Sequence, residues 1–120
     1  MAKATPQSTI PPDRLERYDR LVATLPGVER KGVTVPHTSV NGNMFSFLTP
    51  TGSLALRLAP EDRAAFIERH RTTLHEAHGT VMKEYVSVPD DVFADPAAIE
   101  PHLAASHAYA AGLKPKPTKR

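Results

Sequence analysis

The sequence predicts a single α+β domain in which an antiparallel β-sheet packs with helices in two layers. Three observations predict it: a helical apolar repeat near the N-terminus, two turn signals within residues 40–58 that separate alternating apolar residues, and an alanine-rich helical segment near the C-terminus. A chain of 120 residues has the size of one domain and can bury a core without disulfides.

Three segments differ in composition. Residues 1–11 mix Thr, Ser, Pro and Gln without periodicity, so we expect a disordered N-terminal segment. Residues 12–112 carry the periodic patterns and form the domain. Residues 113–120 form a basic tail that Pro115 and Pro117 keep extended.

The first helix is expected to begin at Pro11 or Pro12, where a missing N–H costs nothing. It runs to Leu25, before Pro26-Gly27 stops it. Its apolar stripe recurs at spacings of three and four residues and comprises Leu15, Tyr18, Leu21, Val22 and Leu25.

Turn residues then divide the chain into strands. Pro36 confines the first strand to a sheet edge or a bulge, because proline cannot donate to a central ladder. Asn41-Gly42 predicts a type I′ hairpin, and Pro50 with Gly52 predicts a second turn. Val33 and Val35 start the first expected strand. The second covers residues 44–49, and the third covers residues 53–58.

The second half begins with a helix, because Pro60 precedes two acids that suit a positive helix end. Pro101 must lie in the first turn of the last helix. The expected elements are a helix from Pro60 to the Arg69-His70-Arg71 run, strands over 72–74 and 85–88, and a helix from near Ile99 to Gly112.

The length of the second loop decides which side chains face the core. If Pro50-Thr51-Gly52 is a three-residue loop with Gly52 in a left-handed conformation, Leu48 pairs with Leu54 and Met44 meets Leu58. Carried through the first turn, this register adds Val33 and Val35 to the same aliphatic face. That face is then the core.

The opposite face then displays Phe45, Phe47, Ala55 and Arg57, with Thr38 and Pro36 nearby. Leaving both rings in water would forgo about 3–6 kcal/mol. Either the last helix, a partner chain or a second copy should therefore cover them.

A four-residue loop gives the alternative register. Leu48 then pairs with Ser53, Phe47 with Leu54 and Phe45 with Leu56. In that register the aromatic face becomes the core. The three-residue loop is preferred because it explains why residue 52 is glycine.

Four short motifs follow one another in a family-like order. They are G-V-E-R-K-G (27–32), N-G-N-M-F (41–45), L-A-L-R-L (54–58) and V-M-K-E-Y-V-S-V-P (81–89). In order and spacing they resemble the N-terminal domain of the TfoX/Sxy family of bacterial competence regulators, over residues 12–112.

The resemblance implies a small α+β domain without catalytic residues, found in many stand-alone proteins. After Arg30-Lys31 the family usually has a Met-Phe-Gly-Gly turn, whereas this chain reads G-V-T-V-P-H-T. Full-length regulators also append a second helical domain, and here only the basic tail follows Gly112.

The basic pI of 9.1 belongs to the tail. Lys114, Lys116, Lys119 and Arg120 are four of the fifteen basic residues, which leaves residues 1–113 with eleven basic and thirteen acidic groups. These four cations are the possible nucleic-acid contacts, although such a contact would be weak and blind to sequence. No aromatic residue interleaves them for base stacking.

No signal peptide or membrane-spanning run is found in the sequence, and there is no cysteine. We therefore expect a cytoplasmic protein that does not enter a membrane. Without cysteine there is no thiolate nucleophile and no zinc site that uses sulfur.

The six histidines invite a metal hypothesis, above all in the segment His70–His78. His75-Glu76-Ala77-His78 is one residue too short for the H-E-x-x-H zinc motif, because its two histidines need an i, i+4 spacing. We assign no metal ligand and expect no cofactor.

Catalytic and phosphate-binding patterns are also missing. The serines lack a G-x-S-x-G or S-x-x-K context, and the glycines form no phosphate loop. Asp90-Asp91 follows Pro89 and resembles the solvated start of a turn or helix. We assign no catalytic residue.

The sequence favours a non-enzymatic protein-interaction or regulatory module that self-associates. A second chain would cover the Phe45 and Phe47 face or pair along the Pro36 edge. Arg57 would supply the polar contact that defines this interface. One alternative is a regulator that contacts nucleic acid through its tail. Another is a small metal-dependent or hydrolytic enzyme that uses the segment His70–His78.

Overall fold

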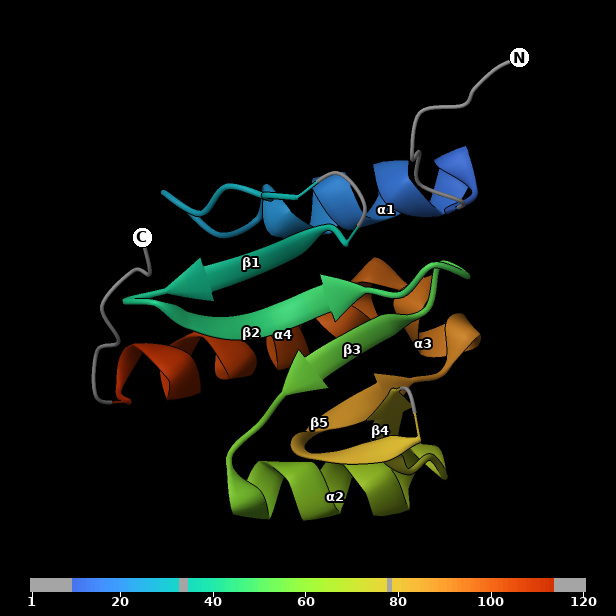
Figure 1. Ribbon diagram of the computed structural model, residues 1–120, viewed down its shortest axis with the longest axis vertical. Helices are drawn as coiled ribbons and strands as arrows, with labels where there is room; N and C mark the ends of the chain where they lie inside the picture. Colours follow the sequence, from blue (N-terminus) through green and yellow to red (C-terminus); the bar gives the residue numbers. More distant parts are fainter. Residues whose placement is uncertain (1–9, 33–34, 78, 114–120) are drawn as a thin grey trace.

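A computed structural model describes residues 10–32, 35–77 and 79–113. It confirms the α+β class: a five-stranded antiparallel sheet packs with four helices (Figure 1). In chain order the elements are α1 (Pro12–Val22), β1 (His37–Val40), β2 (Asn43–Leu48), β3 (Leu54–Arg57), α2 (Pro60–His70), β4 (Leu74–Ala77), β5 (Thr80–Val88), α3 (Asp90–Phe93) and α4 (Pro96–Ala111).

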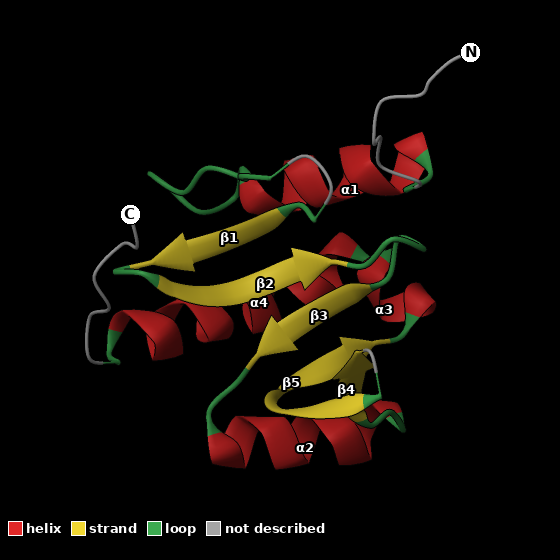
Figure 2. Cartoon of the chain, in the orientation of Figure 1, coloured by secondary structure: helices red, strands yellow, loops and turns green. Residues whose placement is uncertain are grey.

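The helices of the described residues leave one face of the sheet open. The strand order is β1-β2-β3-β5-β4, so β1 and β4 are the edge strands. Helix α4 crosses β1, β2 and β3 on one face, and α3 packs beside it. Figure 2 shows the strands in front and α3 and α4 behind them, with α1 and α2 at the two ends of the sheet.

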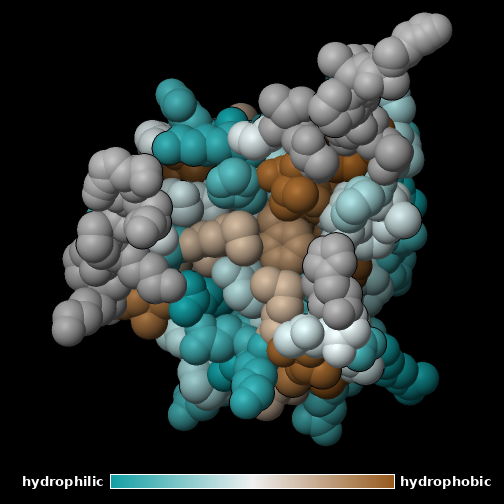
Figure 3. All heavy atoms as spheres, in the orientation of Figure 1, coloured by the Kyte–Doolittle hydropathy of each residue, from teal (hydrophilic) through white to brown (hydrophobic). Residues whose placement is uncertain are grey.

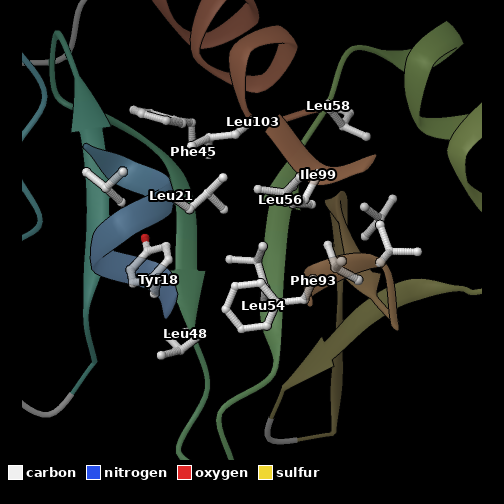
Figure 4. Close-up of a cluster of buried hydrophobic side chains, with 14 of the residues drawn as sticks. Tyr18, Leu21, Phe45, Leu48, Leu54, Leu56, Leu58, Phe93, Ile99 and Leu103 are labelled. Carbon is white, nitrogen blue, oxygen red and sulfur yellow. The ribbon is translucent and has the colours of Figure 1, made fainter. Parts of the chain in front are cut away.

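The core fills the space between the sheet and the helices. Its strand residues include Leu48, Leu54 and Leu56, which meet Leu103 of α4 and Leu21 of α1 (Figure 4). Burying each of these aliphatic side chains contributes about 1.5–3 kcal/mol. Ile10, which lies ahead of the predicted domain boundary at residue 12, is also buried in this core.

The three-residue loop between β2 and β3 is confirmed. Leu48 pairs with Leu54, and the Thr49 N–H donates to the Ser53 carbonyl at 2.8 Å. Gly52 has φ +91°, the left-handed conformation that the register argument required. The alternative four-residue register is therefore wrong.

Gly52→Ala should lower the free energy of unfolding by about 1–3 kcal/mol. Besides the positive φ, an added Cβ would lie 2.4 Å from Cδ of Arg14. Gly27→Ala is the matched control, because Gly27 has a similar φ of +79° and no atom within 4 Å of an added Cβ. Urea denaturation of both variants would separate the clash from the backbone strain, and equal losses would contradict the clash.

A β-bulge in β2 overturns the prediction that Phe45 and Phe47 share a face. Thr38 pairs with Ser46 but Ser39 pairs with Met44, so Phe45 is an extra residue in the ladder. Phe45 is fully buried in the core, where its ring contacts the edge of His107 in α4 at 5.2 Å between centroids. The last helix thus covers Phe45 but not Phe47.

Two other residues also lie on the face of the sheet opposite to the one predicted. Met44, predicted in the core, lies on the open face. Thr38, predicted near the outward face, is completely buried in a cluster of hydroxyl groups. In this cluster Ser46 Oγ hydrogen-bonds to Thr38 Oγ1 and, at 2.6 Å, to Oη of Tyr18 in α1.

The first strand begins later than predicted. β1 starts at His37, Val33 lies outside the described residues, and Val35 is 44% exposed, not in the core. Pro36 is buried, and its carbonyl accepts the Leu48 N–H at 2.9 Å. Beside it, His37 and Lys31 exchange two backbone hydrogen bonds of 2.8 Å, so this part of the edge is already paired.

The predicted ends of the outer elements also change. α1 ends at Val22, three residues before Leu25, and β5 covers nine residues where only 85–88 were expected. α4 begins at Pro96 because the Asp95 side chain caps it, accepting the Ala97 N–H at 3.1 Å. Pro101 therefore lies inside the helix, beyond its first turn.

Candidate functional site: the open-face groove

A row of side chains crosses the open face of the sheet. Phe47 of β2 pairs with Ala55 of β3, and Ala55 pairs with Ser87 of β5. Because alanine has the smallest side chain of the three, the surface is hollowed at the middle of the row. The His75 ring, from β4, contacts the Phe47 ring edge-on, with centroids 5.2 Å apart.

A groove of about 630 Å³ lies around this row, within the range typical of ligand-binding clefts. We call it the open-face groove. Figure 3 shows apolar side chains gathered over the middle of this face, with hydrophilic ones around them. Half of the lining residues are apolar: Val35, Met44, Phe47, Pro50, Met82 and Val88.

The other half are polar: Thr49, Thr51, Ser53, His75, Glu76 and Ser87. Glu76 is the only acidic residue among them, and no lysine or arginine lines the groove. The groove therefore has little net charge and offers no counter-charge to phosphate. Two methionines give it walls that can adapt to an occupant.

His75 is the buried polar group of the groove. Only 8% of it is exposed, and its Nδ1 hydrogen-bonds to Ser87 Oγ at 2.9 Å. Burial lowers the pKa of His75, because the surroundings disfavour its charged form. The imidazole is therefore neutral at neutral pH.

A charged cluster lies beside the groove. The Arg57 Nε donates to Glu84 Oε1 at 2.6 Å, and the Arg57 guanidinium lies 5.9 Å from the centre of the Tyr85 ring. The Tyr85 hydroxyl donates to the Met44 carbonyl at 2.7 Å, and burial raises the pKa of Tyr85. Arg57 is thus already paired within the domain.

The His75–Ser87 pair resembles a base beside a nucleophile, but the rest of such a site is missing. The Ser87 N–H donates to the Thr73 carbonyl at 3.0 Å, so it cannot bind a developing oxyanion. No described carboxylate hydrogen-bonds to the His75 ring to orient it. The pair can give an occupant one polar contact.

The structure separates the residues of the predicted interaction surface. Phe47 lies in the open-face groove and is 7% exposed, whereas Phe45 belongs to the core. Pro36 is buried, and Arg57 lies outside the groove lining. The possible nucleic-acid contacts Lys114, Lys116, Lys119 and Arg120 lie outside the described residues.

The two described histidines of the segment His70–His78 lie in different parts of the fold. His70 is the last residue of α2, His75 faces the groove from β4, and His78 lies outside the described residues. Within the described part of the chain, no three histidine or acidic side chains are grouped so that they could hold a metal ion.

Of the twelve residues that line the groove, sequence reasoning had assigned only Phe47 to the interaction surface; the residues it missed include Met44, His75, Met82 and Ser87. The bulge moves Met44 to this face, and the other three arrive through the pairing of β5 with β3 and β4. A sign of this pairing was the alternation within V-M-K-E-Y-V-S-V, which is longer than the strand predicted there.

No known family model matches the sequence, and no curated protein matches it. Among the helices of the described residues, none combines the length and the apolar character needed to span a membrane.

Proposed function

We propose that this chain is a non-enzymatic protein-interaction or regulatory module that self-associates through the open-face groove. The single observation that supports it most is the groove itself, an apolar hollow on the sheet face opposite α3 and α4. The four sequence motifs support the further proposal of a domain of the TfoX N-terminal type. A cytoplasmic location, which the absence of cysteine favours, belongs to the same proposal.

The composition of the groove favours a second copy as the occupant. An apolar patch that faces its own copy across a two-fold axis buries both patches at once. Only Glu76 among the lining residues carries a charge at neutral pH, so two such faces repel each other little. A nucleic acid would instead need a cationic face.

The hydrogen bonds of the groove support a role in binding. Ser87 and His75 are hydrogen-bonded to each other, and the Ser87 N–H donates to the Thr73 carbonyl. Such a site can orient a partner but offers no stabilisation for a charged intermediate.

Val35→Asp should weaken self-association by about tenfold or more in dissociation constant, because it would bury an unpaired carboxylate at the interface. Val35 is 44% exposed and lines the groove, so the change should not disturb the fold. Sedimentation velocity over a range of protein concentrations measures the effect.

Val81→Asp is the matched control. Val81 is 47% exposed, similar to Val35, but does not line the groove. Its variant should associate as the unmodified chain does. A chain that stays monomeric at every concentration, or an equal effect of the two substitutions, would show that the groove does not join two copies.

A further inference from the structure

Helix α2 packs against the rest of the domain through the buried Phe66 and the partly buried Ile67. The Phe66 ring contacts two imidazoles, and the three rings form a triangle. The centroid of the His70 ring is 4.6 Å away and that of His102 in α4 is 4.8 Å away. The two imidazoles also contact each other edge-on at 5.4 Å.

The environment of this histidine pair suits neutral rings. Nε2 of His70 is buried and has no hydrogen-bond partner among the described residues. A protonated imidazole donates from both nitrogens, so a charge there would leave one N–H unsatisfied. Two protonated rings in contact would also repel each other.

The charged groups around the pair do not offset such a charge. From α2, Arg69 and Asp62 line a small cavity of about 140 Å³ together with His102, so one cation opposes one anion there. On α4, Glu100 lines a different cavity with Arg17 and Arg20. From β5, Lys83 accepts a hydrogen bond from α2 through its carbonyl, and Glu84 is paired with Arg57.

We propose that helix α2 is an acid-sensitive latch, which protonation of His102 beside His70 releases from α4. Phe66 and His70 of α2 then lose their contacts with the His102 ring. The Arg63 side chain, which donates to the Lys83 carbonyl, leaves with the helix.

The direction of the response follows from the proton affinities. Burial, His70 and Arg69 lower the pKa of His102 while the helix is docked, and Asp62 opposes them. Once the helix is released, His102 returns towards its ordinary pKa near 6.5 and binds a proton more readily. Docking is therefore complete at higher pH and weakens as the pH falls below about 6.5.

Release of α2 would also affect the order of the open-face groove. Lys83 is the neighbour of Met82, which lines the groove. Loosening this part of β5 would remove order from one wall. This consequence for a partner rests on the proposed function, whereas the latch itself does not.

Hydrogen exchange read by mass spectrometry tests the latch at about pH 7.5 and about pH 5.5, on either side of the ordinary histidine pKa. After correction for intrinsic exchange rates, protection of the α2 amides should fall about tenfold for each pKa unit that separates docked from released His102. Protection in β2 and β3 should fall less. Equal losses in α2 and in these strands would mean global unfolding and would overturn the latch.

Three variants assign the response to the histidine pair. His102→Gln should remove most of the pH response of α2. His107 lies on the same helix but contacts Phe45, so His107→Gln should keep the response. Arg69→Glu changes an exposed residue and should shift release to lower pH, since a carboxylate stabilises the protonated pair. If His102→Gln opens α2 at both pH values, Arg69→Glu decides alone: an unchanged pH response would overturn the latch.

Discussion

Phe45→Ala should lower the free energy of unfolding by about 3–5 kcal/mol, the loss typical of a fully buried aromatic side chain. The Phe45 ring is completely buried between the sheet and α4, beside Leu103 (Figure 4). The Phe45 carbonyl accepts a hydrogen bond of 2.8 Å from Ser106 of α4, so both the ring and the backbone of the bulged residue are held by this helix. The resulting cavity should stay open, because the Ser106 hydroxyl shares its single proton with the Arg57 carbonyl at 2.6 Å and so holds α4 in place.

Phe47→Ala provides the comparison two residues away. Phe47 lies on the open face and contacts the rings of His75 and Tyr85, outside the core cluster. Its removal should cost about 1.5–3 kcal/mol, the transfer term without an enclosed cavity. Urea denaturation of both variants measures the order, and an equal or reversed order would contradict the bulge.

The unmodified protein should lose about 2–3 kcal/mol of stability as the pH rises from about 10 to just above 12, because of Tyr18. Burial raises the pKa of Tyr18 from 10.0 to about 12, against the effect of its hydrogen bonds with Ser46 and Thr38. Above pH 10 the tyrosine of the unfolded chain ionises while the buried one stays neutral. The unfolded state therefore binds fewer protons, and stability falls as the pH rises.

Tyr18→Phe isolates this effect. The variant should lose about 1–3 kcal/mol at neutral pH, because Ser46 in the buried hydroxyl cluster loses a partner, but it should lack the alkaline decrease. Tyr109→Phe, at a half-buried position of α4, is the control and should keep the decrease. Urea denaturation at several alkaline pH values measures the slopes. An identical slope in Tyr18→Phe and the unmodified chain would exclude Tyr18 as its source.

Local signals in the sequence predicted the fold where one residue type determines one geometry. Gly52 fixed the three-residue loop because its backbone adopts a positive φ, and that loop correctly placed Leu48, Leu54 and Leu56 in the core. Proline at the first positions of α1 and α2 likewise marked the start of each helix.

The sequence could not reveal the bulge. M-F-S-F-L alternates equally well with or without an extra residue, and only packing against α4 and Tyr18 decides that Phe45 and Ser46 both face the helices. Pro101 misled the prediction for α4 because proline is expected at a helix start. Pro96 occupies that position, with Asp95 as the cap.

The candidate site was only half predictable. Phe47 could be placed on the open face from the loop register alone. The opposite wall comes from β4 and β5, whose irregular pairing shifts register between Leu74 and His75. No local pattern specifies that shift, so His75 and Ser87 could not be assigned to the site in advance.

The extra residue in β2 has a consequence for how this domain can evolve. In a regular strand, aromatic neighbours at alternate positions share a side, so selection on one constrains the other. Here Phe45 stabilises the interior while Phe47 borders solvent on the reverse side. Substitutions at position 47 can therefore accumulate without rebuilding the interior, so the two faces of a single strand can change independently.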